Sequence, residues 1–167
     1  LGGHSLGGQL ACCLAGQHPQ RFAALWLVAS GTPYWRSFPH PLRHALPLVY
    51  RFLPWLARRL GVLPGRRLGF GGNEAPHLIA DWARVGLTDR YVASGMAQDL
   101  DADMAHCNVP VQGIVLADDW MAPASSLQRL VARLGTGTPG ILRLDAHALG
   151  TRADHFAWMR APATVAD

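Results

Sequence analysis

The sequence has 167 residues, of which 50% are hydrophobic and 16% are charged, and its formal net charge is +4. A chain of this size and apolar content can bury a core of its own, so we exclude a disordered or low-complexity protein. Its three cysteines, with Cys12 and Cys13 adjacent, fit neither a disulfide framework nor a metal-ligand spacing, so we expect buried thiols, no metal, no cofactor and a cytoplasmic location.

The chain opens on a glycine-rich motif that is followed by a helix and a strand. Gly3-His4-Ser5-Leu6-Gly7 fits the pattern G-x-S-x-G. The Pro-free stretch from Gly7 to Gln17 contains several apolar residues and predicts a short buried helix. The apolar run from Ala23 to Ala29 stops at Ser30-Gly31 and predicts a strand that is buried on both faces of a parallel sheet.

The stretch from Thr32 to Ser94 breaks this alternation of helix and strand. Its prolines divide it into short helices rich in apolar and basic residues, which indicates an inserted helical cap. These prolines are Pro33, Pro39, Pro41, Pro47, Pro54 and Pro64. Between Leu42 and Leu63, arginines interrupt every window of about 18 apolar residues that a membrane span requires, so we expect no stable span.

The sequence contains no lysine, and its charges are unevenly distributed. Eight arginines and no acidic residue precede Glu74, whereas seven arginines and eleven acidic residues occur from Glu74 onward. A basic segment favours nucleic acid, an anionic membrane surface or an acidic substrate as a partner. The arginines between Arg36 and Arg67 are interleaved with Leu, Pro, Phe and Trp, which favours a solvated helix face and no nucleic-acid partner. A polyanion-binding or membrane-surface role for the cap is the alternative.

The last part of the chain predicts a unit of strand, helix and strand. Val111 to Ala117 and Ile141 to Leu144 are apolar runs typical of buried strands. Between them, Ser125 to Leu134 has apolar residues at helical spacing, and a helix that joins two strands in this way predicts a right-handed parallel crossover. The sequence therefore predicts an α/β fold, a partial doubly wound parallel sheet with an inserted helical cap. We divide it into residues 1–31 as the first part of the core, residues 32–94 as the cap, and residues 95–167 as the C-terminal core.

Ser5 lies at a sharp predicted turn from strand to helix, where the flanking glycines leave room for the backbone. The free N–H groups at the start of the helix, including that of Leu6, favour the negative charge that develops in acyl transfer. A serine nucleophile also needs a histidine to accept its proton and a carboxylate to orient that histidine. His4, beside the serine, is expected to point away from it.

Candidates for the acid and the base follow the last two predicted strands. Asp118 and Asp119 come after the strand that ends at Ala117, and catalytic groups of open α/β sheets gather at such strand ends. His147 and His155 come after the last strand, and only His155 leads directly into an apolar helical stretch. We interpret His155 as the base, with His147 as the alternative, and both aspartates are candidates for the acid.

Three motifs together resemble the α/β-hydrolase superfamily: Gly-His-Ser-Leu-Gly-Gly, Asp-Asp-Trp-Met-Ala-Pro and Asp-His-Phe. The resemblance covers nearly the whole chain. It implies a serine hydrolase with a triad of Ser5, Asp119 and His155, since Asp-x-x-x-Pro resembles the acid loop of the family. It also implies that Leu6 is an oxyanion donor. Asp154 departs from the family pattern, because a glycine usually precedes the catalytic histidine.

The resemblance further implies that the sequence is the C-terminal part of such a hydrolase. The second oxyanion donor then lies in preceding sequence, and loss of one donor lowers the rate by about 100- to 1,000-fold, so we expect the fragment alone to be feebly active or inactive. The strand from Ala23 to Ala29 is expected to present an unpaired apolar edge, which favours aggregation.

The resemblance also bears on the substrate, which we expect to be a small ester or related acyl compound with an apolar group. Residues 30–36 and 64–69 are similar to a bacterial branch of hydrolases without an assigned substrate. Bulky cap residues fit an apolar substrate, and packing of the cap explains them equally well: Trp35, Phe38, Tyr50, Phe52 and Trp55. A catalytically inactive binding protein of the same fold, or a peptidase or thioesterase, is the alternative. The sequence does not indicate an oligomeric state.

Overall fold

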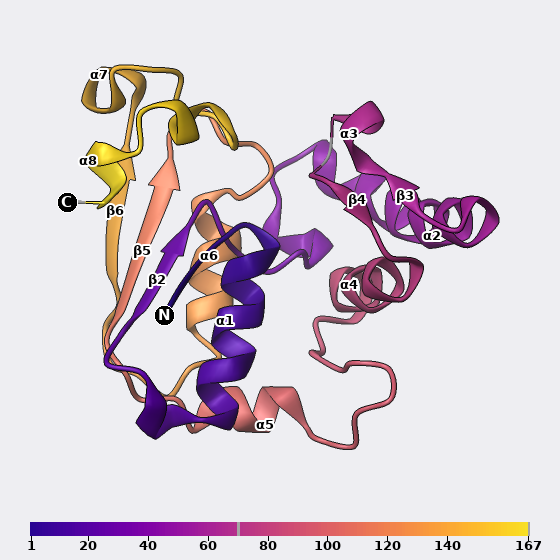
Figure 1. Ribbon diagram of the computed structural model, residues 1–167, viewed down its shortest axis with the longest axis horizontal. Coiled ribbons are helices and arrows are strands. Elements are labelled where there is room, and N and C mark those ends of the chain that lie inside the picture. The colour runs from indigo at the N-terminus through magenta and orange to yellow at the C-terminus, as the bar shows by residue number, and fades with distance from the viewer. Residues whose placement is uncertain (70, 167) are drawn as a thin grey trace. The chain divides into compact units, whose positions relative to one another are not determined.

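A computed structural model describes residues 1–69 and 71–166 of the chain (Figure 1). The backbone divides into two compact units. The sheet unit consists of Leu1–Thr32 with Leu100–Asp167, and the helical unit consists of Pro33–Asp99. Each unit is described by itself below.

The sheet unit is built on four parallel strands in the order β1-β2-β5-β6. The strands are β1 (Gly2–His4), β2 (Leu25–Val28), β5 (Val111–Leu116) and β6 (Gly140–Leu144). The register places Gly3, Leu27, Gly113 and Ile141 in one row across the sheet, and the next row begins with His4. The prediction of an α/β fold with a parallel sheet is therefore confirmed.

The prediction that the second strand presents an unpaired edge is wrong. β1 pairs with β2 in parallel, so that Gly2 lies beside Trp26 and His4 lies beside Val28. The three residues of β1 are enough for this pairing because a parallel ladder needs only backbone N–H and C=O groups, which glycine supplies as well as any residue. Among the described residues, the edge strands of the sheet are β1 and β6, and β2 is an inner strand.

Helices lie on both faces of the sheet (Figure 1). They are α1 (Leu6–Gln17), α5 (Leu100–Ala105), α6 (Ala124–Val131), α7 (Ala146–Leu149) and α8 (Ala163–Ala166). On the face of α1 and α6, the Leu127 side chain fills the space that a Cβ on Gly113 would need. On the opposite face, Ile114 and Leu144 form a buried cluster with Val165 of α8. These two layers hold the ends of the strands in place.

The helix between β5 and β6 starts and ends earlier than the sequence predicts. The sequence predicts Ser125 to Leu134, whereas α6 starts after Pro123 and its last helical residue is Val131. Pro123 is extended and lacks an N–H group, so it is well suited to precede the first helical turn. Leu127, Leu130 and Val131 are buried, as the helical spacing predicts.

The helical unit contains one long helix where the sequence predicts several short ones. Its elements are a 3₁₀ turn (Trp35–Ser37), α2 (Leu42–Leu60), α3 (Gly65–Leu68), α4 (Pro76–Thr88) and the antiparallel strands β3 (Leu63–Pro64) and β4 (Asn73–Glu74). Pro47 and Pro54 lie inside α2 and each removes one backbone donor. The prediction that these prolines divide the segment is therefore wrong.

Packing explains why α2 continues through its prolines. Leu46, Tyr50, Leu53 and Ala57 are buried at helical spacing on one face, which packs against α4. The ring of Tyr50 lies edge-on to Trp82 at 5.0 Å and occupies the space beside Gly86 of α4. Burial of each large apolar side chain contributes about 1.5–3 kcal/mol, which offsets the lost hydrogen bonds. Over the described residues, neither α2 nor any other helix combines the length and apolar character that crossing a bilayer requires.

Candidate active site

Ser5 occupies a strained backbone position between β1 and α1. Its φ of 55° and ψ of −125° lie in a region that residues other than glycine rarely adopt. Such a conformation costs on the order of 1–3 kcal/mol and persists only where its surroundings enforce it. Here the Ser5 N–H donates to the Val28 carbonyl at 3.1 Å, and the Ser5 carbonyl accepts from the Ser30 hydroxyl at 2.7 Å. The turn is thus held from both sides.

The glycines around Ser5 have different roles. A Cβ on Gly3 would lie 2.3 Å from the backbone of Gly7, and a Cβ on Gly8 would lie 2.3 Å from the Ser30 Oγ. A Cβ on Gly7 would meet no atom within 4 Å. The expectation that the flanking glycines leave room for the backbone therefore holds for Gly3 and Gly8 and is wrong for Gly7.

This difference predicts opposite effects of alanine at adjacent positions. Gly8→Ala is expected to lower the free energy of unfolding by about 1–3 kcal/mol, because the new methyl group displaces Ser30 and breaks its hydrogen bond to Ser5. Gly7→Ala is expected to leave it unchanged or raise it by up to about 1 kcal/mol, because alanine favours the helix. Urea unfolding of both variants measures the difference, and equal destabilisation would contradict the assignment.

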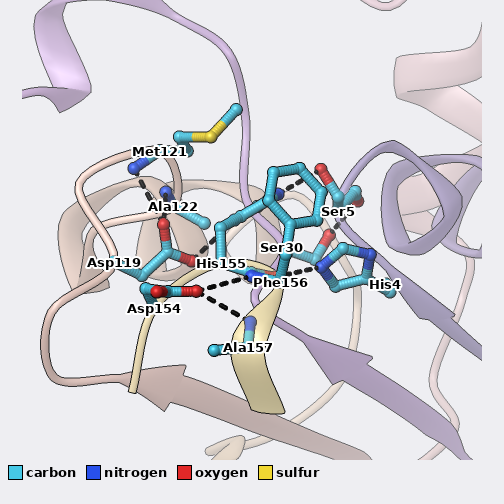
Figure 2. Close-up of polar contacts among 10 residues, drawn as sticks. All are labelled: His4, Ser5, Ser30, Asp119, Met121, Ala122, Asp154, His155, Phe156 and Ala157. Carbon is cyan, nitrogen blue, oxygen red and sulfur yellow. Dashed lines mark hydrogen bonds and ion pairs between the residues drawn. The ribbon is translucent and has the colours of Figure 1, made fainter. Parts of the chain in front are cut away.

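Asp119 follows β5 in a loop that buries its carboxylate. Its side chain is 0% exposed. Oδ1 accepts the N–H groups of Met121 at 2.8 Å and Ala122 at 3.1 Å (Figure 2). These donors fix the carboxyl plane and leave Oδ2 to face His155, whose Nδ1 lies 2.7 Å away.

His155 connects the carboxylate to the serine through both of its ring nitrogens. Its Nε2 lies 2.8 Å from the Ser5 Oγ, and its residue is 5% exposed. An ionised carboxylate only accepts hydrogen bonds, so the contact with Asp119 assigns the proton to Nδ1. Nε2 is then free to accept the proton of the Ser5 hydroxyl. The structure thus brings together Ser5, Asp119 and His155, three residues far apart in the sequence.

The alternative candidates lie elsewhere. Asp118 is exposed, and its backbone N–H donates to the Ala153 carbonyl at 3.0 Å. His147 is exposed on α7, the short helix that Asp145 caps through its side chain. Of the two aspartates and two histidines that the sequence offers, only Asp119 and His155 contact each other as an acid and base require.

Two further residues of the site were not expected from the sequence. Ser30 is 1% exposed and positions the Ser5 carbonyl through the hydrogen bond described above. His4 was expected to point away from Ser5, and strand alternation does place its row on the face opposite α1. On that face, however, its imidazole contacts His155, with Nε2 2.9 Å from the His155 carbonyl oxygen. The alternation along β1 is a signal in the sequence that could have placed His4 there.

Asp154 stabilises the loop that carries the histidine. Its Oδ1 accepts the N–H groups of Phe156 at 3.1 Å and Ala157 at 2.7 Å, and its Oδ2 lies 3.3 Å from Arg152 Nε. These backbone donors, with Arg152, hold the pKa of Asp154 below its usual value. The aspartate at the position of the usual family glycine therefore caps the turn after His155. Over the described part of the chain, no group of three or more His, Cys, Asp or Glu side chains is arranged to hold a metal.

Comparisons with known proteins identify the fold. Residues 1–70 match the family model for the alpha/beta hydrolase fold. No curated protein matches the sequence significantly. Among solved structures, the mouse alpha/beta hydrolase domain-containing protein 10 matches with a TM-score of 0.56 and 18% identity, over 99% of this chain and 56% of that one.

Two structures from Mycobacterium tuberculosis are similar to a comparable degree. Rv0554 matches with a TM-score of 0.55 and 15% identity, over 98% of this chain and 61% of that one. BpoC of strain H37Rv matches with a TM-score of 0.54 and 17% identity, over 98% of this chain and 62% of that one. The chain thus spans 56–62% of the length of these three structures. The matched segment is similar to the α/β-hydrolase family, and the structural likeness shows that the chain has the α/β-hydrolase fold.

Proposed function

We propose that the protein is a serine hydrolase that cleaves an ester or a related acyl bond, with Ser5 as nucleophile, His155 as general base and acid, and Asp119 as the residue that orients His155. The observation that carries this proposal is the continuous hydrogen-bonded path from the Ser5 Oγ to His155 at 2.8 Å and on to Asp119 at 2.7 Å. A nucleophile, a base and an orienting acid in this order are the parts that acyl transfer through serine requires.

In the first half of the reaction, Ser5 Oγ attacks the acyl carbon while its proton passes to His155 Nε2. The Asp119 carboxylate stays ionised and stabilises the imidazolium that forms. The tetrahedral intermediate then expels the alcohol, which takes its proton from Nε2, and an acyl group remains on Ser5. In the second half, water gives its proton to Nε2 and attacks this acyl group. The intermediate that forms expels the Ser5 oxygen, which takes the proton back from Nε2, so the acid is released and Ser5 and His155 are restored.

The N-terminus of α1 is suited to stabilise the negative charge of the tetrahedral intermediate. Leu6 is the first residue of the helix, so its N–H has no carbonyl partner within the helix. We assign it as an oxyanion donor, since it directly follows the nucleophile and lies at the positive end of the helix dipole. The strained conformation of Ser5 directs its Oγ toward His155 at this helix end (Figure 2).

Exposed aromatic residues that adjoin His155 and Asp119 in the sequence favour a substrate with an apolar group. Phe156 is 41% exposed and Trp120 is 64% exposed, and they directly follow His155 and Asp119 in the chain. The bulky cap residues proposed from the sequence differ in exposure. Phe38 and Tyr50 are buried in the helical unit, whereas Phe52 and Trp55 are exposed. An apolar acyl or alcohol group that covers Phe156 and Trp120 would remove their surface from water, which favours binding.

Covalent labelling tests the proposal. A fluorophosphonate is expected to label the full-length, folded protein on Ser5, as the serine oxygen displaces fluoride from phosphorus. Ser5 is the only hydroxyl-bearing residue between Leu1 and Arg21, so a label that fragment-ion mass spectrometry of the tryptic peptide ending at Arg21 places within this range lies on Ser5. The Ser5→Ala variant and urea-unfolded protein are the controls, and both are expected to remain unlabelled at this peptide. A folded protein that is not labelled at Ser5 would favour an inactive binding protein.

A further inference from the structure

His4 contacts the proposed base from the strand that carries the nucleophile. It is the last residue of β1, directly before Ser5, and its Nε2 lies 2.9 Å from the main-chain carbonyl oxygen of His155. The two imidazole rings are also close, with centroids 4.7 Å apart and an interplanar angle of 49°. Figure 2 shows His4 on one side of the His155 backbone, with Asp154 close to the turn that follows.

The chemistry of this contact defines the state of His4. A carbonyl oxygen only accepts hydrogen bonds, so the His4 Nε2 must carry a proton and donate it. Burial lowers the pKa of His4 below its ordinary value, and the neighbouring His155 lowers it further. The contact therefore assigns a proton to His4 Nε2, and the lowered pKa favours the neutral form of the ring. As a neutral ring it does not oppose the positive charge that His155 acquires when it accepts the serine proton.

His155 needs such support because no helix or strand holds it. It lies in a turn between β6 and the short 3₁₀ helix Ala157–Arg160. Asp154 binds the two N–H groups that follow His155, and His4 binds its carbonyl. The ring of His4 is fixed in turn by Trp158, whose ring centroid is 5.6 Å away.

We propose that His4 is a positioning residue for the general base: its hydrogen bond to the His155 carbonyl fixes His155 Nε2 at the distance from Ser5 Oγ that proton transfer requires. This inference rests on the proposed function. It gives the nucleophile and the base a connection that does not depend on the hydrogen bond between them. The connection therefore persists while the serine oxygen is bonded to an acyl group and Nε2 activates water.

Two substitutions of His4 separate the effect of its ring shape from the effect of its hydrogen bond to the His155 carbonyl. His4→Phe keeps a planar ring against Trp158 and removes the donor, whereas His4→Gln keeps an N–H donor on a side chain of similar reach. His106→Phe is the matched control, because His106 also hydrogen-bonds a main-chain carbonyl, that of Ala102 at 2.8 Å, but is exposed and directly follows α5. The melting temperature of each variant shows whether it is folded.

We expect His4→Phe to lower kcat and the rate of Ser5 phosphonylation about 10- to 100-fold, since a displacement of about 1 Å in a catalytic group has effects up to this size. KM is expected to change less than about twofold, because His4 makes no contact in the proposed binding of the substrate. His4→Gln is expected to recover most of the loss, and His106→Phe to behave as the unmodified protein. Alkyl esters should lose more than nitrophenyl esters, because an alkoxide needs the proton of His155 to leave.

Two outcomes overturn the inference. Phosphonylation of His4→Phe at the unmodified rate would show that the hydrogen bond does not position His155. Equal losses in His4→Phe and His4→Gln, with the same loss for alkyl and nitrophenyl esters, would show a purely structural role. Failure of the proposed function is distinguishable from both, since the unmodified protein would then not be labelled at Ser5 at all.

Discussion

Replacement of His155 by glutamine is expected to lower kcat by a factor on the order of 10⁵ to 10⁶. His155 Nε2 lies 2.8 Å from the Ser5 Oγ, and the Ser5 proton has no other base at that distance in the proposed mechanism. A glutamine amide can contact both neighbours, but it cannot accept a proton near neutral pH. The residual rate then reflects oxyanion stabilisation and substrate binding alone. Steady-state hydrolysis of a nitrophenyl ester measures the loss.

His147→Gln is the matched control for this experiment. His147 was the alternative base from the sequence, and it is exposed on α7. We expect His147→Gln to retain the kcat of the unmodified protein within about twofold, as surface substitutions usually do. A large loss in His147→Gln with activity retained in His155→Gln would reverse the assignment of the base.

Asp119→Asn is expected to lower kcat by about 10⁴-fold. Asp119 Oδ1 accepts the N–H groups of Met121 and Ala122, so the amide oxygen of asparagine takes that position. The amide NH₂ group then faces His155 Nδ1, which must become an acceptor. The proton of His155 moves to Nε2, and that nitrogen can no longer accept the proton of Ser5. The variant therefore keeps its packing and loses the tautomer on which catalysis depends.

Asp118→Asn tests whether this effect belongs to one aspartate. Asp118 is adjacent in sequence but exposed, so its substitution is expected to change kcat by less than about twofold. Retention of more than a tenth of the activity in Asp119→Asn would contradict the proposed role of the carboxylate.

The central strands and helices could be predicted from the sequence because each has a local signal. Leu25–Val28 and Val111–Leu116 are continuous apolar runs, and both lie within the predicted strands. β1 has no such signal, since Gly2–His4 contains no β-branched or aromatic residue and pairs only because β2 lies beside it. The course of α2 through Pro47 and Pro54 depends in the same way on tertiary packing, which outweighs a local preference.

In the candidate site, too, local features could be predicted from the sequence, whereas contacts between distant segments could not. The G-x-S-x-G motif and the positions after β5 and β6 are local features, and the residues chosen from them are those that the structure brings into hydrogen-bond contact. Their catalytic roles stay predictions until the variants are measured. Ser30 and His4 act through contacts between distant segments, Ser30 with Ser5 and His4 with the loop of His155. A sequence motif does not show which distant loops come into contact at the end of a strand.

The distance along the chain between Ser5 and His155 has a consequence for biosynthesis. The two residues whose side chains lie 2.8 Å apart are separated by 150 positions. At about 5–20 residues per second, a ribosome needs roughly 8 to 30 s to proceed from one to the other. The emerging polypeptide carries its serine throughout that interval without the imidazole that would activate it. Under the proposed mechanism, a nascent chain therefore cannot carry out acyl transfer at Ser5 before His155 has been synthesised.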